Sequence, residues 1–208
     1  MGKTYEKYSI DESIFTSLDE KSAYILGVIF ADGNIEKDNS RLCISSKDFD
    51  WLNNIAKIFG NPPIKKRIRK NKEWYVLSIN RKKIVSDLMK YGITENKSLT
   101  MEFPNIDKQF LRHFIRGYFD GDGSIRIDKK RGYQLDFACG SGEFSKRLLT
   151  ILNRNIYHGF HLYHKRKNYW NIRGFNKAWK EFSNFIYKDA TIYLPRKKLD
   201  DAIVQSLK

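Results

Sequence analysis

The chain has 208 residues, with 39 Lys and Arg against 24 Asp and Glu, which gives a formal net charge of +15. Its 12 Tyr, 14 Phe and 4 Trp, interrupted by only four prolines, exclude a disordered chain. No apolar run reaches the eighteen or so residues of a membrane span, and the N-terminus lacks a signal sequence's apolar core. We therefore expect an intracellular protein that binds no membrane, in a compartment the sequence does not specify. The excess of positive charge predicts a polyanion as its partner.

The first predicted element is a helix over residues 18–32, opened by a capping box of Ser17 and Glu20 and ended at Asp32. A strand over 41–46 follows, and then an amphipathic helix carrying Leu52 and Ile55 on one stripe. Two basic strands and a closing helix complete an αββαββα order, at residues 64–70, 74–80 and 82–92.

From residue 105 the same order begins again. A helix over 107–122 ends at Asp122, and strands, a second helix, a hairpin and a final helical region follow, at residues 125–127, 133–139, 144–152, 160–173 and 177 onward. Asp32 and Asp122 lie 90 residues apart and Ile79 and Ile172 lie 93 apart, so the register holds across the chain. We therefore predict an α+β fold of tandem repeats about a pseudo-twofold axis, with halves at residues 1–104 and 105–208.

Small residues recur every four positions on the two helices that end at these aspartates. Ala23, Gly27 and Ala31 form the first stripe, and Gly117 and Gly121 form the second. A glycine inside a helix costs about 1 kcal/mol relative to alanine. A tolerated core glycine explains one such helix but explains two poorly, so we predict that the two helices pack closely on each other.

If those helices pair, the carboxylates of Asp32 and Asp122 meet at their C-termini. The helix dipole and the like charge both oppose this arrangement unless a cation intervenes. Mg²⁺ is the natural candidate, because one or two carboxylates, water and phosphate oxygens hold it. The alternative is that each aspartate only accepts hydrogen bonds in the turn before a glycine.

The segments ILGVIFADG (25–33) and IRGYFDGDG (115–123) resemble the LAGLIDADG motif of the homing endonucleases. The repeated αββαββα order is similar to the single-chain, monomeric members of that family. The resemblance implies two curved antiparallel sheets that form a saddle over double-stranded DNA, with divalent metal at Asp32 and Asp122. It also implies double-strand cleavage across the minor groove with short 3′ overhangs. The metal would be Mg²⁺, with Mn²⁺ as a substitute and Ca²⁺ supporting binding alone.

Two positions depart from the family motif. Phe30 stands where the motif has its first aspartate, a residue that the second copy keeps as Asp120. We expect Phe30 to affect packing rather than chemistry. Arg116 replaces the motif's small second residue.

Alternation along the predicted strands separates an apolar face from a polar face suited to base edges in the major groove. Basic loops are suited to phosphates. A solvated surface is the usual alternative for such charges, but nine Lys or Arg against one Glu between Lys65 and Lys83 favour DNA binding. The predicted contacts are Arg41, Ser45, Lys65, Arg67, Arg69, Trp74, Ser78, Gln134, Asp136, Tyr169, Asn171 and Arg173 on strands, and Lys70, Lys72, Lys129, Lys130, Arg131, Lys165, Arg166 and Lys167 in loops.

The family resemblance also implies catalytic residues that position the attacking water beside the two acids. The matching positions are Ser46, Lys47 and Ser141 after the second strands, and Asn80, Arg81 and Arg173 after the fourth. Two other functions remain open on the same scaffold: a maturase that binds intron RNA, and a DNA-binding regulator without catalysis. A regulator would be expected to lose one or both acids, and both are present.

Overall fold

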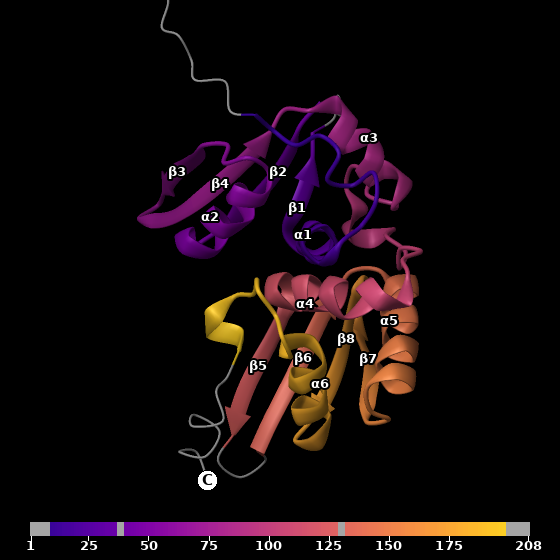
Figure 1. Cartoon of the computed structure of the whole chain (residues 1–208). Helices are drawn as coiled ribbons and strands as arrows, with labels where there is room; N and C mark the ends of the chain where they lie inside the picture. The colour runs from indigo at the N-terminus through magenta and orange to yellow at the C-terminus, as the bar shows by residue number, and fades with distance from the viewer. Residues whose placement is uncertain (1–8, 37–39, 129–131, 199–208) are drawn as a thin grey trace, which may run out of the picture.

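The computed structural model describes residues 9–36, 40–128 and 132–198. The described chain folds into two units with the same order of elements (Figure 1). The first unit contains α1 (Glu20–Asp32), β1 (Gly33–Ile35), β2 (Leu42–Ser46), α2 (Phe49–Ile58), β3 (Ile64–Arg69), β4 (Lys72–Ile79) and α3 (Lys82–Lys90). The second contains α4 (Leu111–Asp122), β5 (Gly123–Asp128), β6 (Gly132–Cys139), α5 (Gly142–Asn155), β7 (Phe160–Arg166), β8 (Tyr169–Phe175) and α6 (Lys177–Tyr187). Three short 3₁₀ helices are η1 (Lys97–Leu99), η2 (Lys108–Phe110) and η3 (Pro195–Lys197).

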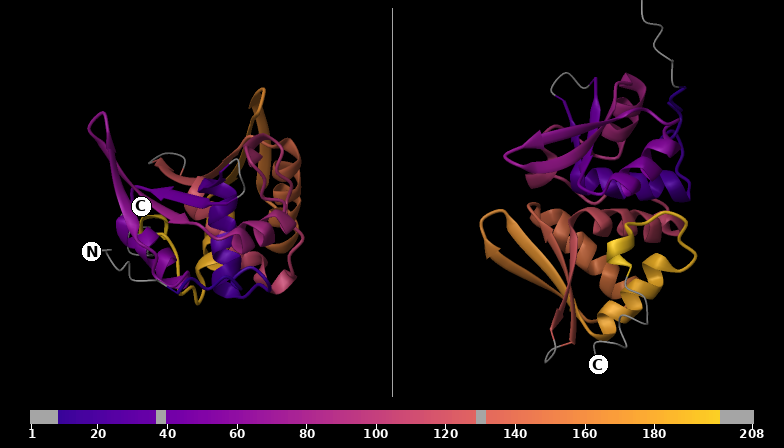
Figure 2. Two further views of the ribbon diagram at one scale, coloured as in Figure 1. Left: turned by 90° about the horizontal axis from the view of Figure 1, so that it is seen from above. Right: turned by 90° about the vertical axis from the view of Figure 1, so that its left-hand side faces the viewer.

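Each unit forms one four-stranded antiparallel sheet. The strand orders are β1-β2-β4-β3 and β5-β6-β8-β7, which are the same order repeated. This confirms the predicted α+β fold of tandem αββαββα units. The β3–β4 and β7–β8 hairpins extend from the central helices toward the same side of the molecule (Figure 2).

Helices α1 and α4 lie side by side at the centre, one from each unit (Figure 1). A methyl group added at Gly27 would overlap the Phe114 carbonyl oxygen, and one added at Gly117 would overlap the Tyr24 carbonyl oxygen. Only glycine allows the backbones to approach this closely, so the prediction from the small-residue stripes is confirmed.

The predicted capping box at Ser17 is wrong by two residues. Helix α1 begins at Glu20, and the side chain of Asp19 accepts a hydrogen bond from the Ser22 amide at 2.7 Å. Ser22 Oγ in turn accepts from the Asp19 amide at 2.7 Å. Asp19 provides the same reciprocal arrangement as the predicted box, so it caps the helix in place of Ser17.

Phe30 packs in the core, as expected. Its ring lies 5.2 Å from that of Phe114 and 6.0 Å from that of Phe144, both on the second unit. The first motif helix therefore has an apolar contact where the second carries Asp120. Within the described residues, no helix combines the length and the hydropathy needed to cross a bilayer.

Candidate metal centre and nucleic-acid interface

Asp32 and Asp122 are the last residues of α1 and α4. Because the helices pack in register, a methyl group at Gly121 would lie 3.1 Å from Asp32 Oδ2. The pKa of Asp122 is raised to about 6, first by burial and next by the negative charge of Asp32. Partial desolvation also raises the pKa of Asp32, against the opposing charges of Lys197, Lys97 and Arg196. The structure therefore brings the two acids together, as the pairing of the helices predicts.

The residue before Asp32 is not a metal ligand. Ala31 occupies this position, and its methyl side chain offers no atom to a cation. A methyl group added at Gly121 would come within 2.3 Å of the Ala31 side chain. Position 31 therefore belongs to the packing of α1 on α4, and the carboxylates of the centre come from Asp32 and Asp122.

Two buried lysines that the sequence interpretation missed flank the acids. Lys197 Nζ donates to three carbonyl oxygens at the end of α4, at 2.7 Å to Phe119, 2.6 Å to Asp120 and 3.1 Å to Gly121. These carbonyls would otherwise lack partners at the helix C-terminus. Burial lowers the pKa of Lys197 to about 8, while the charges of Asp120, Asp32 and Asp122 oppose that shift.

Lys97 has the corresponding place beside the first helix. Its Nζ donates to the carbonyl oxygen of Gly33, the residue that follows α1. Burial lowers the pKa of Lys97, and the charges of Asp122 and Asp32 partly restore it. The site is thus two carboxylates between two ammonium groups, each lysine on a short 3₁₀ helix.

This donor set suits a hard divalent cation. Across residues 9–36, 40–128 and 132–198, no group of three or more His, Cys, Asp or Glu is placed to hold a metal ion. Zinc sites need three or four such ligands. Mg²⁺ and Mn²⁺ keep waters and accept one or two carboxylates with the remaining positions open to phosphate oxygens, which is what Asp32 and Asp122 offer.

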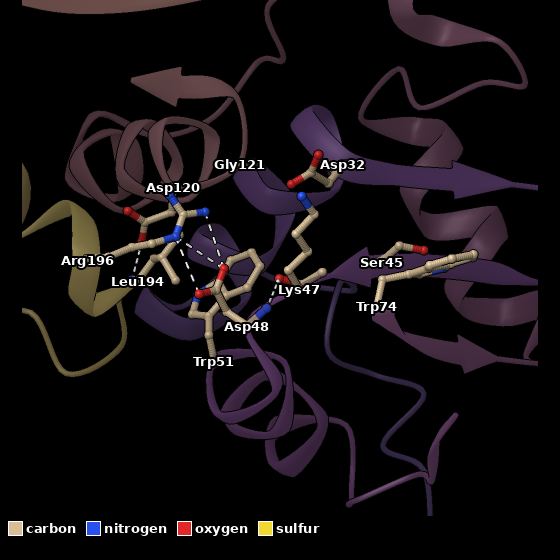
Figure 3. A pocket seen from close by; sticks show the side chains of 11 residues that line it. Asp32, Ser45, Lys47, Asp48, Trp51, Trp74, Asp120, Gly121, Leu194 and Arg196 are labelled. Atoms are coloured by element: carbon tan, nitrogen blue, oxygen red, sulfur yellow. Dashed lines mark hydrogen bonds and ion pairs between the residues drawn. The ribbon is translucent and has the colours of Figure 1, made fainter. Parts of the chain in front are cut away.

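A pocket of about 270 Å³ opens beside Asp32. Ser45, Ser46, Lys47 and Trp74 line it from the first sheet, and Lys47 extends toward Asp32 from the far side (Figure 3). Gly121, Asp120 and Arg196 line it from the second unit. The predicted residues after β2 therefore lie near the acid, although Ser46 Oγ also accepts a hydrogen bond from the Asp48 amide at 3.0 Å.

The structure does not bring Ser141 to the acids as a water-positioning residue. Ser141 is buried as the N-cap of α5, where its hydroxyl donates to the Met101 carbonyl at 2.6 Å and accepts from the Phe144 amide at 3.3 Å. The donor and one acceptor position of this hydroxyl are used within the fold and the side chain is buried, so we remove Ser141 from the catalytic set.

Asn80 and Arg81 lie away from the acids. Gly33 pairs with Ile44, which pairs with Leu77 on β4. Asn80 directly follows β4 and lies three residues, or roughly 10 Å, beyond Leu77. There Asn80 Oδ1 accepts a hydrogen bond from Arg41 at 2.5 Å, and Arg81 pairs with Glu12 at 3.0 Å. The structure therefore moves both residues from the catalytic set to the outer part of the sheet.

Three predicted DNA contacts on the second sheet bind one another. Arg173 Nε donates to Asp136 at 2.8 Å and to Asn171 Oδ1 at 2.7 Å. Asp136 and Asn171 are buried, with only 4% and 3% of their surfaces exposed. As predicted, these side chains lie on the face of the sheet opposite the core residues Phe137 and Ile172, but partners within the sheet cover them, so their contact with bases stays a prediction. Arg173 is half-buried and is held by both side chains, and its catalytic role stays a prediction.

The remaining predicted contacts have varied surroundings. The basic residues of β3 and of the ends of both hairpins are exposed. They are Lys65, Arg67, Arg69, Lys70 and Lys72 in the first unit, and Lys165, Arg166 and Lys167 in the second. Tyr169 is covered by Lys165 and Arg166, whose cations lie 5.8 and 5.4 Å from its ring centre. Arg41 pairs with Glu36, Ser78 lies against Cys43, and Gln134 donates to Asp136. Lys129, Lys130 and Arg131 lie outside the described residues.

Comparison with known proteins identifies the two units. A family model for the LAGLIDADG-like domain matches residues 19–91 and 109–175. An uncharacterized protein of Methanocaldococcus jannaschii is 31% identical over 165 residues, covering 73% of this chain and 55% of that protein. The probable translation initiation factor IF-2 and the replication factor C small subunit of the same organism are 27% and 29% identical over 66% and 65% of this chain. The chain spans only 12% and 7% of those two proteins.

Solved structures share the fold. The homing endonuclease I-WcaI bound to its DNA recognition sequence matches 96% of this chain and 95% of its own, with a TM-score of 0.64 and 17% identity. Full-length WhiA from Thermatoga maritima matches 95% of this chain and 65% of its own, with a TM-score of 0.60 and 19% identity. I-DmoI in complex with DNA and Mn matches 82% of this chain and 98% of its own, with a TM-score of 0.54 and 19% identity.

Proposed function

Because this chain belongs to the family of LAGLIDADG-like domains, we propose that it is a site-specific homing endonuclease. In this proposal it cuts both strands of a long double-stranded DNA target across the minor groove and leaves short 3′ overhangs. The observation that carries the proposal is the convergence of Asp32 and Asp122 at the ends of two packed helices, between two buried lysines.

The fold alone does not select this function, since it is shared with homing endonucleases and with WhiA. A protein that only binds DNA has no need to hold two carboxylates together, which repel each other and an approaching phosphate. Their retention, with lysines that reduce the repulsion, supports cleavage over binding alone. The matches to a small part of an initiation factor and of a replication factor subunit support a genetically mobile domain. A sequence copied from gene to gene would form a small insertion in proteins that are otherwise unrelated.

Asp32 and Asp122 would hold the divalent cation, proposed as Mg²⁺. When bound, that cation would lower the pKa of a water molecule and offset charge on the phosphate. Lys97 and Lys197 keep the carboxylates ionised and add positive charge where a phosphate would lie. Lys47 borders the same pocket, where it can orient the attacking water. Hydrolysis forms one bond from that water to phosphorus and breaks one to the departing oxygen, which takes up a proton.

A cleavage assay on a randomised plasmid library tests the proposal. The wild-type protein is expected to select one long site in Mg²⁺ and to bind it without cutting in Ca²⁺. We expect Asp32→Asn or Asp122→Asn to lower the cutting rate by at least about a hundredfold, because changes to groups that only support metal ligands already cost 10- to 100-fold. Binding in Ca²⁺ should persist, and Asp50→Asn, at an exposed acid on α2, is the matched control.

Two results would count against the endonuclease. Unchanged cutting by both Asn variants would remove the acids from the mechanism. If no cut site is recovered, a DNA-binding regulator is supported by sequence-specific binding alone, whereas a maturase is supported when the purified protein stimulates splicing of an intron RNA.

A further inference from the structure

Residues 187–197, which we name the C-terminal arm, cross over α4 and bring Lys197 to the end of that helix (Figure 1). Arg116 on α4 holds the beginning of this path. Its guanidinium is fully buried and donates to the carbonyl oxygens of Ile186 and Ile192, each at 2.9 Å. A buried guanidinium without such acceptors would be strongly destabilising, so the path of the chain and the cation depend on each other.

Asp120, one turn further along α4, holds the end of the arm. Its carboxylate is 1% exposed and accepts hydrogen bonds from the Leu194 amide at 2.8 Å, from Tyr187 at 3.0 Å and from Tyr24 at 2.7 Å. Two of these donors belong to the arm. Asp120 therefore fixes both ends of the segment that immediately precedes Lys197.

The same network reaches the first unit. Tyr24 on α1 accepts a hydrogen bond from Trp51 Nε1 on α2 at 2.7 Å while its hydroxyl donates to Asp120. Next to Lys197, Arg196 pairs with Asp48 at 3.3 Å, also in the first unit. The arm is thus tied to both halves of the molecule.

Within the part of the chain that the structure describes, the first unit has no such network. The positions that correspond to Asp120 and Arg116 are Phe30 and Leu26, and both side chains are buried in the apolar core. Lys97 does not need one, because it lies on the connection between α3 and α4, with Ile93 and Met101 buried on either side. The chain itself fixes Lys97, whereas Lys197 depends on contacts made by its arm.

We propose that Asp120, together with Arg116 and Tyr187, is a positioning device that holds Lys197 beside the two acids. This explains why only the second motif carries an acid and an arginine where the first is apolar. The inference rests on the proposed endonuclease function for its effect on cutting, but the position of Lys197 can be measured without cleavage.

Pulse acetylation with a residue-by-residue mass spectrometric readout measures that position. Tyr187→Phe removes one hydrogen bond to Asp120 and keeps the ring, and Tyr193→Phe, on the same arm but without a bond to Asp120, is the matched control. We expect Lys197 to react about tenfold faster in Tyr187→Phe, the scale of one lost hydrogen bond to a charged group. The reactivity of Lys97 should not change, and neither lysine should respond to Tyr193→Phe.

Cutting rates in a second background separate positioning from general destabilisation. We expect Tyr187→Phe to lower the single-turnover rate about tenfold in the wild type and in Lys97→Met, but less than about twofold in Lys197→Met, because coupled residues are not additive. Equal losses in both lysine backgrounds, or unchanged acetylation of Lys197, would overturn the positioning role. A wild-type protein that never cuts would refute the proposed function, while the acetylation result still decides whether the Tyr187–Asp120 contact positions Lys197.

Discussion

At the residue level, the candidate centre depends on ionisable groups whose pKa values are displaced toward each other. Burial raises the pKa of Asp122 to about 6 and lowers the pKa of Lys197 to about 8. Neither charge would be stable in that position alone, and each partly compensates the other. A divalent cation favours the ionised carboxylates further, so metal affinity and protonation are linked.

This linkage gives a prediction about pH. A raised pKa in the folded state means that Asp122 contributes stability below about pH 4, and that this contribution is lost as the pH rises through about 6. Mg²⁺ competes with that proton. We expect its apparent dissociation constant, from thermal shift titrations, to fall about tenfold per pH unit up to about pH 6 and to level off above it.

The matched variants for this titration are Asp122→Asn and Asp50→Asn. The first should remove most of the pH dependence of the Mg²⁺ shift, and the second should preserve it. A Mg²⁺ affinity that is flat between about pH 4 and 7 in the wild type would contradict the assignment of metal to Asp122.

The residues of the centre were unequally predictable. Asp32 and Asp122 are visible in the sequence because each ends an apolar helical run before a glycine, twice at one spacing. Lys97 and Lys197 are two among 39 Lys and Arg, and nothing local marks them. Their roles arise only when η1 and η3 fold back on the ends of α1 and α4.

At the level of elements, the paired helices depend on their glycines. We expect Gly117→Ala to lower the free energy of unfolding by about 3 kcal/mol. The new methyl group would lie against the Tyr24 carbonyl, whose carbon atom would be only 2.9 Å from it. In an isolated helix the same change would gain about 1 kcal/mol, so the sign of the effect reports on the packing. Urea unfolding measures it.

Gly92→Ala is the contrasting control for this helix-packing prediction. Gly92 has a φ of +89° and no neighbouring atom within 4 Å of an added methyl group. Only the left-handed backbone conformation opposes alanine there, at a cost of about 1–2 kcal/mol. A Gly117→Ala protein as stable as the wild type would mean that α1 and α4 are not in close contact.

Local sequence signals predicted the elements well where one signal dominated. Alternation placed Leu77 and Ile79 on the buried face of β4, as found. Competition between equivalent signals explains the misplaced cap, since Asp19 and Ser17 can both begin a helix. Alternation also placed Asn171 on the face opposite the core, but it could not predict that the Phe137 carbonyl at 3.2 Å and Arg173 would cover its side chain.

At the scale of the whole molecule, duplication explains both the repeated sheets and their common orientation. The two sheets repeat one strand order, and their long hairpins extend to the same side of the paired helices (Figure 2). A duplex bound on that side would meet the exposed basic strand β3 from one unit and the basic end of β7 from the other. The direction of the hairpins follows from tertiary packing, so the sequence predicted the basic strands but only the family resemblance implied a saddle.

The final prediction tests this surface through its dependence on salt. Arg67 and Arg69 are exposed on β3. We expect Arg67→Ser/Arg69→Ser to weaken DNA binding in Ca²⁺. The slope of log affinity against log salt should fall by about 2, since each phosphate contact contributes about 0.9 to it. Stability should be unaffected, because both side chains are exposed. Lys21→Ser/Lys180→Ser removes the same charge from exposed positions on α1 and α6, outside the basic run, and should leave the slope unchanged. Equal slope changes in both variants would mean that net charge alone, rather than the β3 surface, determines how the protein binds DNA.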